Sequence, residues 1–303
     1  MDKIKIIFDT DIGDDIDDAF ALAMLLNSPE VEILGVTTVY RNAELRAKIV
    51  SHLLNLYGKK IGVYMGEDNP IQDPIAHFSF ESIGKDGKPI IPHYSEEMED
   101  AQIEEKSAVD FLLETVEETP GEIVVLAIGP LTNLALARRK NPEVFSKIKS
   151  IYLMGGEILG VNKEWNFVCD TVAAEEVLKS GVDIKMYPLN VTRPCILTKE
   201  VVDHFCSLKD AGNVALAKML QKWLKDNEYK KNPTMHDGLA AVGSFHTFCK
   251  MSELSFAIYP DGVRGLIRPV FTKEQADCTV QVATLVDYAG FIEFLKERIR
   301  DVK

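Results

Sequence analysis

Short β-rich runs alternate with helical patterns over the first 200 residues of the chain. The β-rich runs hold many isoleucines and valines and are bounded by glycine, proline or polar residues, as strands are; they span residues 4–8, 31–39, 61–64, 123–128, 151–154 and 184–187. Helical patterns lie between them at residues 17–26, 44–56, 108–118, 131–139 and 173–179. Strand–helix alternation gives a mostly parallel sheet with right-handed crossovers. We therefore predict a Rossmann-like α/β fold, a mostly parallel central sheet flanked by helices.

The rest of the chain breaks this rhythm without marking a second domain. Residues 67–100 hold four prolines, so we expect a long loop of the kind that forms lids and binding loops. Further helices are predicted at residues 213–226, 237–247 and 291–299, and further strands at 263–271 and 278–286. No internal repeat, low-complexity tract or linker divides the sequence. We expect one domain over residues 1–303.

Composition limits the partners and the compartment. The chain has 34 basic and 47 acidic residues, a formal charge of −13, which disfavours nucleic acid or an anionic membrane surface as the main partner. The longest apolar run, residues 19–26, is far shorter than the roughly 20 residues that span a bilayer. The five cysteines are odd in number and never form CxxC, as in reduced proteins. We expect a soluble, cytoplasmic protein with a cation or a neutral small molecule as its partner.

An acidic segment follows the first predicted strand. Six aspartates fall within ten residues, between positions 9 and 18, where open α/β sheets bind ligands. One or two acids at a helix start can serve as caps. Six exceed that need, since like charges a few ångström apart repel by about 1 kcal/mol each even in water. A hard divalent cation would relieve the repulsion, and oxygen ligands favour calcium or magnesium over zinc.

Two familiar aspartate motifs fit this segment poorly. An EF-hand loop counted from Asp9 needs glycine at its sixth position and glutamate at its twelfth, where this chain has Asp14 and Phe20. The DxDx(T/V) motif of haloacid dehalogenase-type phosphatases is matched by Asp9 and Asp11, but Gly13 stands in place of its threonine or valine. A magnesium-dependent phosphohydrolase with Asp9 as nucleophile therefore stays an alternative.

A third motif, DxDxGxDDA, resembles residues 9–13 and 17–19, with two extra residues between its ends. It opens the inosine–uridine-preferring nucleoside hydrolases, and the resemblance to that family continues in order through residues 35–42, 128–135, 154–156, 162–166 and 236–237. It implies the nucleoside hydrolase fold and calcium-dependent hydrolysis of the N-glycosidic bond of ribonucleosides, with ribose and a free base as products. It also implies a homodimer or homotetramer.

The resemblance assigns roles to individual residues. It implies a Ca2+ site made of Asp11, Asp17, Asp18, the backbone carbonyl of Ile128, and Asp237, and a ribose site made of Asn42, Asn162, Glu164 and Asn166. Asp11 would take the proton of the attacking water, and His236 would protonate the departing base, as a pKa near 6.5 allows. Residues 162, 164 and 166 are two apart, so in an extended segment they would point one way and Trp165 the other.

Several departures from the family pattern leave alternatives open. The two extra residues allow Asp14 or Asp15 to replace one of the named metal ligands. Residues 83–87 lack the usual loop histidine, for which His77 or His93 could compensate. Arg41, Asn190 and Arg193 stand where glycine, aspartate and histidine are usual. A nucleoside-binding relative without activity is therefore a second alternative, and the preferred base stays open.

Overall fold

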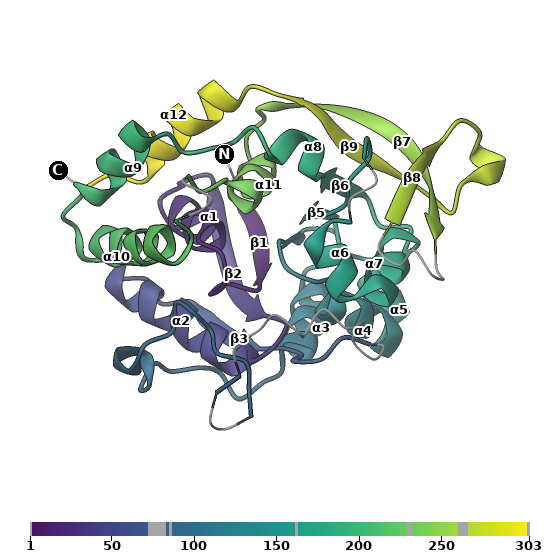
Figure 1. Cartoon of the computed structure of the whole chain (residues 1–303). Coiled ribbons are helices and arrows are strands. Elements are labelled where there is room, and N and C mark those ends of the chain that lie inside the picture. Colours follow the sequence, from purple (N-terminus) through teal and green to yellow (C-terminus); the bar gives the residue numbers. More distant parts are fainter. Residues whose placement is uncertain are drawn as a thin grey trace.

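The computed structural model of the chain describes residues 2–71, 83–84, 87–160, 163–228, 232–259 and 266–301. Nine strands of this part form one sheet in the order β3-β2-β1-β4-β5-β6-β9-β7-β8 (Figure 1). The strands are β1 (Ile4–Thr10), β2 (Val31–Thr38), β3 (Gly62–Met65), β4 (Val124–Ala127), β5 (Ser150–Met154), β6 (Ile184–Tyr187), β7 (Cys249–Tyr259), β8 (Leu266–Val270) and β9 (Cys278–Val286). All neighbours from β3 to β9 pair in parallel, whereas β7 is antiparallel to both β9 and β8. The predicted α/β fold with a mostly parallel sheet is confirmed.

Helices cover both faces of the sheet. They are α1 (Asp17–Leu26), α2 (Ala43–Leu56), α3 (Ala108–Glu118), α4 (Thr132–Lys140), α5 (Pro142–Phe145), α6 (Trp165–Cys169), α7 (Thr171–Leu178), α8 (Leu189–Thr192), α9 (Lys199–Cys206), α10 (Ala211–Asp226), α11 (His236–Gly243) and α12 (Tyr288–Arg298), with short 3-10 helices at Glu96–Met98 and Lys273–Gln275. In β1, Ile6 and Phe8 join the core under α1, α2, α10 and α11, while Ile7 joins the core under α3, α4 and α7. Both faces are thus buried, which is why the central strands are apolar almost throughout.

The register of the sheet determines where the polar loops meet. Asp9 of β1 pairs with Thr37 of β2 on one side and with Ala127 of β4 on the other. The carboxyl ends of these three strands therefore lie next to one another. The acidic segment after β1, the turn after β2 and Ile128 after β4 all leave the sheet at this edge, where open α/β sheets bind ligands.

Several elements outside the parallel strands were not predicted from the sequence. The 11-residue strand β7 was not predicted, and neither was α9. The strand predicted at 263–271 is observed as β8 from Leu266, because residues 260–265 lie outside the described part. In β7 the pairing with β9 shifts register between Lys250 and Met251, and such a bulge interrupts the alternation by which a strand is identified.

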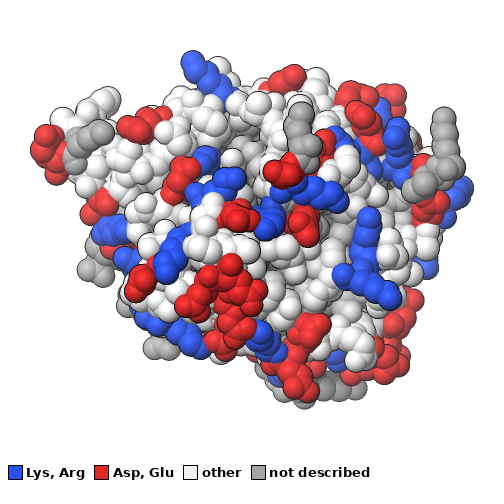
Figure 2. Space-filling model, turned by 180° about the vertical axis from the view of Figure 1, so that it is seen from behind, with Lys and Arg blue, Asp and Glu red and all other residues white. Residues whose placement is uncertain are grey.

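Two further observations concern the surface and the helices. Lysine and arginine side chains lie among aspartates and glutamates on the rear face of the molecule, so charge of neither sign dominates that view (Figure 2). Among the described helices none is both long and apolar enough to cross a membrane.

Candidate active site

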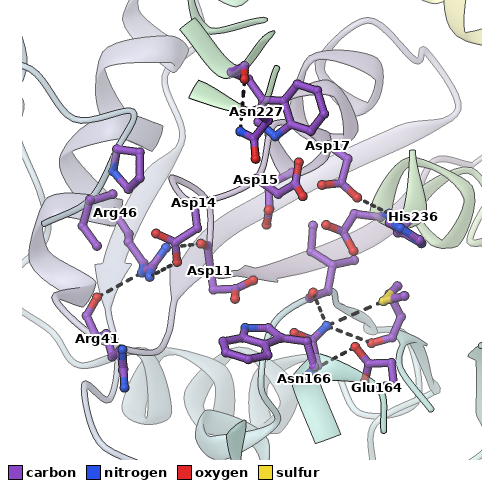
Figure 3. A pocket seen from close by; sticks show the side chains of 18 of the residues that line it. Asp11, Asp14, Asp15, Asp17, Arg41, Arg46, Glu164, Asn166, Asn227 and His236 are labelled. Atoms are coloured by element: carbon purple, nitrogen blue, oxygen red, sulfur yellow. Dashed lines mark hydrogen bonds and ion pairs between the residues drawn. The ribbon is translucent and has the colours of Figure 1, made fainter. Parts of the chain in front are cut away.

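A pocket of about 900 Å³ opens at the carboxyl edge of the parallel strands (Figure 3). Its walls come from the acidic segment and the start of α1, the turn after β2, Ile128, Met154, residues 163–166, Leu189, the end of α10, the start of α11, and residues 89–92. The last group belongs to the predicted long loop, so part of that loop is a pocket wall. Segments from nine places in the sequence thus meet in one cavity, whose volume is usual for a small-molecule site.

Three buried aspartates form the centre of the pocket. One carboxylate oxygen from each of Asp17, Asp18 and Asp237 lies within 4.8 Å of the others. Asp17 and Asp18 begin α1, and Asp237 lies in the first turn of α11, whose backbone N–H at Asp237 donates to Asp17 Oδ2 at 3.1 Å. Burial raises the pKa of Asp17 to about 7, and the charge of Asp15 adds to the rise. Burial and then neighbouring carboxylates also raise the pKa of Asp18 and of Asp237.

Asp11 and the Ile128 carbonyl line the same pocket. Burial raises the pKa of Asp11 to about 7, although the charge of Arg46 opposes the rise. The Ile128 carbonyl accepts a hydrogen bond of 2.7 Å from Asn166 Nδ2 and keeps a second lone pair. Four carboxylates and one carbonyl make an all-oxygen donor set. Without a cation, the negative charges of the four carboxylates would repel one another. These residues therefore fit a hard divalent cation such as calcium.

The two extra aspartates have separate surroundings. Asp14 is exposed, and its Oδ2 lies 2.7 Å from Arg46 Nη2. Asp15 accepts a hydrogen bond of 2.7 Å from the N–H of Ile16 and lines the pocket on the side of Asn227 (Figure 3). The arginine pairing directs the Asp14 carboxylate away from the three-aspartate centre, whereas Asp15 stays a candidate for an auxiliary ligand.

Glu164 and Asn166 line the pocket as predicted, but the segment that carries them is not extended. Glu164 caps α6, and its carboxylate accepts hydrogen bonds from the N–H groups of Asn166, Phe167 and Gly156 at 2.8 to 3.1 Å. The predicted alternation is therefore wrong, because these backbone bonds start a helix at Trp165. Trp165 also lines the pocket, with 48% of its surface exposed, instead of pointing away. Residue 162, the remaining predicted ribose ligand, lies outside the described residues.

Asn42 is not among the lining residues of the pocket. Its side-chain amide donates to the carbonyl of Pro89 at 3.1 Å, and its place toward the cavity is taken by Arg41. The cause is local, since the backbone from Tyr40 to Asn42 is left-handed, with φ values of 71°, 36° and 61°. This turn brings Arg41 into the pocket lining, a position that no sequence motif predicted.

His236 lies at the start of α11 and lines the pocket. Its Nδ1 is 2.7 Å from the hydroxyl of Thr192, which fixes the ring. Asp9, the nucleophile of the phosphohydrolase alternative, is fully buried and does not line the pocket. Its Oδ2 accepts hydrogen bonds from Thr37 and Asn133 at 2.6 and 2.7 Å. A residue so enclosed cannot attack a substrate, so that alternative is excluded.

The other departures from the family pattern lie away from the pocket lining. Asn190 accepts a hydrogen bond from the N–H of Ile158 at 2.8 Å, and Arg193 pairs with Glu157 at 2.7 Å. His93 borders a neighbouring cavity of about 430 Å³, while residue 77 lies outside the described part. Trp223 is buried and also forms part of the pocket wall, together with Asn227 and Lys222. These three wall residues follow no sequence motif that would have identified them.

The fold and the pocket define a hydrolase of the nucleoside hydrolase class. The sequence pattern of the inosine-uridine preferring nucleoside hydrolases matches residues 6–293, and the chain belongs to this family, which cleaves the N-glycosidic bond of ribonucleosides. It is 33% identical to a probable uridine nucleosidase 2 of Arabidopsis thaliana over 99% of this chain and 98% of the relative.

Two solved structures share the fold. A plant nucleoside hydrolase, the PpNRh1 enzyme, superposes with a TM-score of 0.84 at 26% identity and covers 99% of this chain and 100% of its own. A purine-preferring ribonucleoside hydrolase from Gardnerella vaginalis gives 0.79 at 27% identity, covering 97% and 98%. The predicted family, enzyme class and fold are therefore confirmed.

Proposed function

We propose that this protein hydrolyses ribonucleosides to ribose and a free base in a calcium-dependent reaction. The observation that carries the proposal is the set of three buried carboxylates, Asp17, Asp18 and Asp237, each with an oxygen within 4.8 Å of the others and beside Asp11 and the Ile128 carbonyl. Calcium held by these five groups would supply positive charge that acidifies the attacking water and would offer coordination to the ribose hydroxyls.

The reaction passes through a transition state with positive charge on the sugar and negative charge on the leaving base. Asp11 accepts the proton of the attacking water, because its carboxylate lines the same pocket as the other proposed calcium ligands. The Glu164 carboxylate, buried beside the sugar site, favours positive charge on the ribose. Asn166 is fixed by bonds from its Nδ2 to the carbonyls of Ile128 and Met154 and orients the ribose.

His236 completes the proposed mechanism by protonating the departing base. It lines the same pocket as Asp11, and Figure 3 places the two on different sides of it. A base and an acid on separate sides fit a reaction in which water enters at one face of the sugar and the leaving group departs from the other. The contact of His236 Nδ1 with the Thr192 hydroxyl at 2.7 Å holds the ring in place while it protonates the base.

Reducing-sugar release from inosine, uridine, cytidine, adenosine and guanosine, with and without a chelator, tests the proposal. We expect chelator-sensitive release that calcium restores. Asp11→Asn should lower kcat by about 10²- to 10⁴-fold, the usual contribution of a general base. Asp15→Asn, a matched change in the same segment, should retain more activity and more calcium affinity.

Two outcomes would contradict the proposal. Equal loss of calcium affinity in the two variants would show that the ligand assignment is wrong. Calcium-loaded protein that binds nucleosides but releases no ribose from any of them would instead identify a binding protein without activity.

A further inference from the structure

The pocket is not uniformly acidic. Its lining also includes two arginines, Arg41 and Arg46, and an exposed lysine, Lys163, the residue before Glu164. Arg46 is engaged by Asp14, whereas Arg41 stacks on the ring of Tyr40 with its guanidinium carbon 5.2 Å from the ring centroid. A positively charged surface inside a pocket of a protein with a net charge of −13 is a local arrangement that the overall charge does not explain.

Arg41 reaches this position at a conformational cost. Tyr40, Arg41 and Asn42 all have positive φ, a conformation that costs side-chain-bearing residues about 1–2 kcal/mol each. Arg46 Nε holds the turn through bonds of 2.7 and 3.1 Å to the carbonyls of Tyr40 and Arg41, and the Arg41 N–H donates to Asp68 at 2.8 Å. A glycine would adopt the turn without strain, so a buried arginine here points to a use for its side chain.

Arg41 lies at the sugar end of the pocket, an assignment that rests on the proposed function. In Figure 3 it lies on the opposite side of the pocket from His236, the proposed acid at the base. Tyr40, over whose ring the Arg41 guanidinium lies, packs against Cys169 at the end of α6, the helix that Glu164 caps. In a nucleoside the base is on C1′ and the 5′-carbon on C4′, on either side of the ring oxygen. With the base at His236, the 5′-substituent therefore projects toward Arg41.

We propose that Arg41 recognises a 5′-phosphate, so that the protein also hydrolyses ribonucleoside 5′-monophosphates. Guanidinium groups bind phosphate through paired, charge-assisted hydrogen bonds, whereas a neutral 5′-hydroxyl uses a single donor. The reaction needs water alone as co-reactant. Water oxygen bonds to C1′, the C1′–N bond breaks with its electron pair on the base, and the base takes a proton. The products are ribose 5-phosphate and the free base, and the phosphate ester stays intact.

The test compares kcat/KM for uridine and for uridine 5′-monophosphate in calcium-containing buffer. In Arg41→Ala we expect the value for the monophosphate to fall by about 10- to 100-fold, as loss of charge-assisted hydrogen bonds predicts, and the value for uridine to change much less. Arg41→Lys should lie between, because lysine keeps the charge but not the paired geometry. Arg139→Ala removes an equal charge from an exposed pair on α4 and should leave the ratio of the two values unchanged.

A fold control accompanies these variants. Arg41→Gly relieves the left-handed turn, so its melting temperature should not fall although its preference for the monophosphate is lost. Wild-type protein that hydrolyses uridine but not the monophosphate would overturn the proposal, and so would an equal loss on both substrates in Arg41→Ala. A selective loss on orotidine instead would place the recognised anion on the base and would also overturn it.

Failure of the proposed function can be told apart from failure of this inference. If no nucleoside is hydrolysed, calorimetry with ribose and ribose 5-phosphate still tests Arg41 directly. Tighter binding of ribose 5-phosphate that Arg41→Ala abolishes supports phosphate recognition. Equal binding of the two sugars to the wild-type protein overturns it.

Discussion

The three-aspartate centre and Arg46 line the same pocket, but only the buried charge of Arg46 is compensated by neighbouring groups. Asp17, Asp18 and Asp237 gather like charges, and their pKa values rise because the carboxylates are buried and because neighbouring carboxylates repel them. Arg46 is fully buried, yet its guanidinium donates to the carbonyls of Tyr40, Arg41, Asp11 and Ile12 and pairs with Asp14. The contrast teaches that a compensated buried charge holds structure, whereas an uncompensated cluster marks the place where a ligand completes the site.

The largest effect on stability is expected at the compensated charge. Arg46→Met would leave four buried carbonyls in two loops without their side-chain donor, each at a cost of about 1–3 kcal/mol, so we expect the free energy of unfolding to fall by at least about 4 kcal/mol. Urea unfolding measures this change. Arg46→Lys, which keeps the charge but cannot reach both loops, should fall between. A loss below about 1 kcal/mol in Arg46→Met would show that water or the loops themselves replace the bonds.

The sequence predicted the parts of the site that are fixed by the sheet. The aspartates that begin α1 and α11 meet because strand ends and helix starts meet at one edge of a parallel sheet, and motif spacing records that order. The parallel strands were identified for a related reason, since burial on both faces makes them apolar runs. The antiparallel β7, half exposed and bulged, carries no such run and was missed.

Residues whose orientation depends on distant partners could not be predicted. Asn42 turns away from the pocket because two distant groups hold it: its carbonyl accepts a hydrogen bond from the N–H of Arg46, four residues later, and its amide donates to the carbonyl of Pro89, 47 residues later. Glu164 becomes a helix cap because the N–H groups of Phe167 and Gly156 both reach its carboxylate. Neither relation leaves a periodic pattern in the sequence.

The next prediction concerns the uncompensated cluster. The pKa values of Asp11 and Asp17 are raised from 3.8 to about 7 in the folded protein. Without a cation, the folded state therefore binds more protons than the unfolded state between about pH 4 and pH 7. The free energy of unfolding falls as the pH rises through this range. One fixed calcium concentration, ten times the dissociation constant measured at about pH 8, should restore about 1.4 kcal/mol at that pH and less at about pH 5.5, where protons compete for the carboxylates.

Thermal unfolding with calcium and with chelator, at both pH values, measures this linkage. Arg46→Lys serves as a variant in which the three-aspartate centre keeps its residues. A calcium effect of equal size at both pH values would contradict the idea that buried carboxylates bind the ion, because protonated carboxyls compete with it.

The smallest effect on stability is expected at Asp14, which pairs with Arg46 and belongs to the same acidic segment as the proposed metal ligands. Asp14 pairs with Arg46, but 47% of its side chain is exposed, against 1% for Arg46. Water can therefore replace most of what the carboxylate gives up, and Arg46 retains its bonds to four carbonyls. We expect Asp14→Asn to lower the free energy of unfolding by about 0.5 kcal/mol, as exposed pairs do, and to leave calcium affinity unchanged.

Urea unfolding and calcium titration of Asp14→Asn together separate the two roles open to this aspartate. A drop in calcium affinity comparable to that of Asp11→Asn would make Asp14 a metal ligand that leaves Arg46 on binding. Calcium would then replace Arg46 as the partner of Asp14 when the metal binds. An unchanged calcium affinity would show that Asp14 and Asp15 have different roles. Asp14 would then serve only to pair with Arg46, which binds the two loops, whereas Asp15 would remain the one of the two that can assist the metal site.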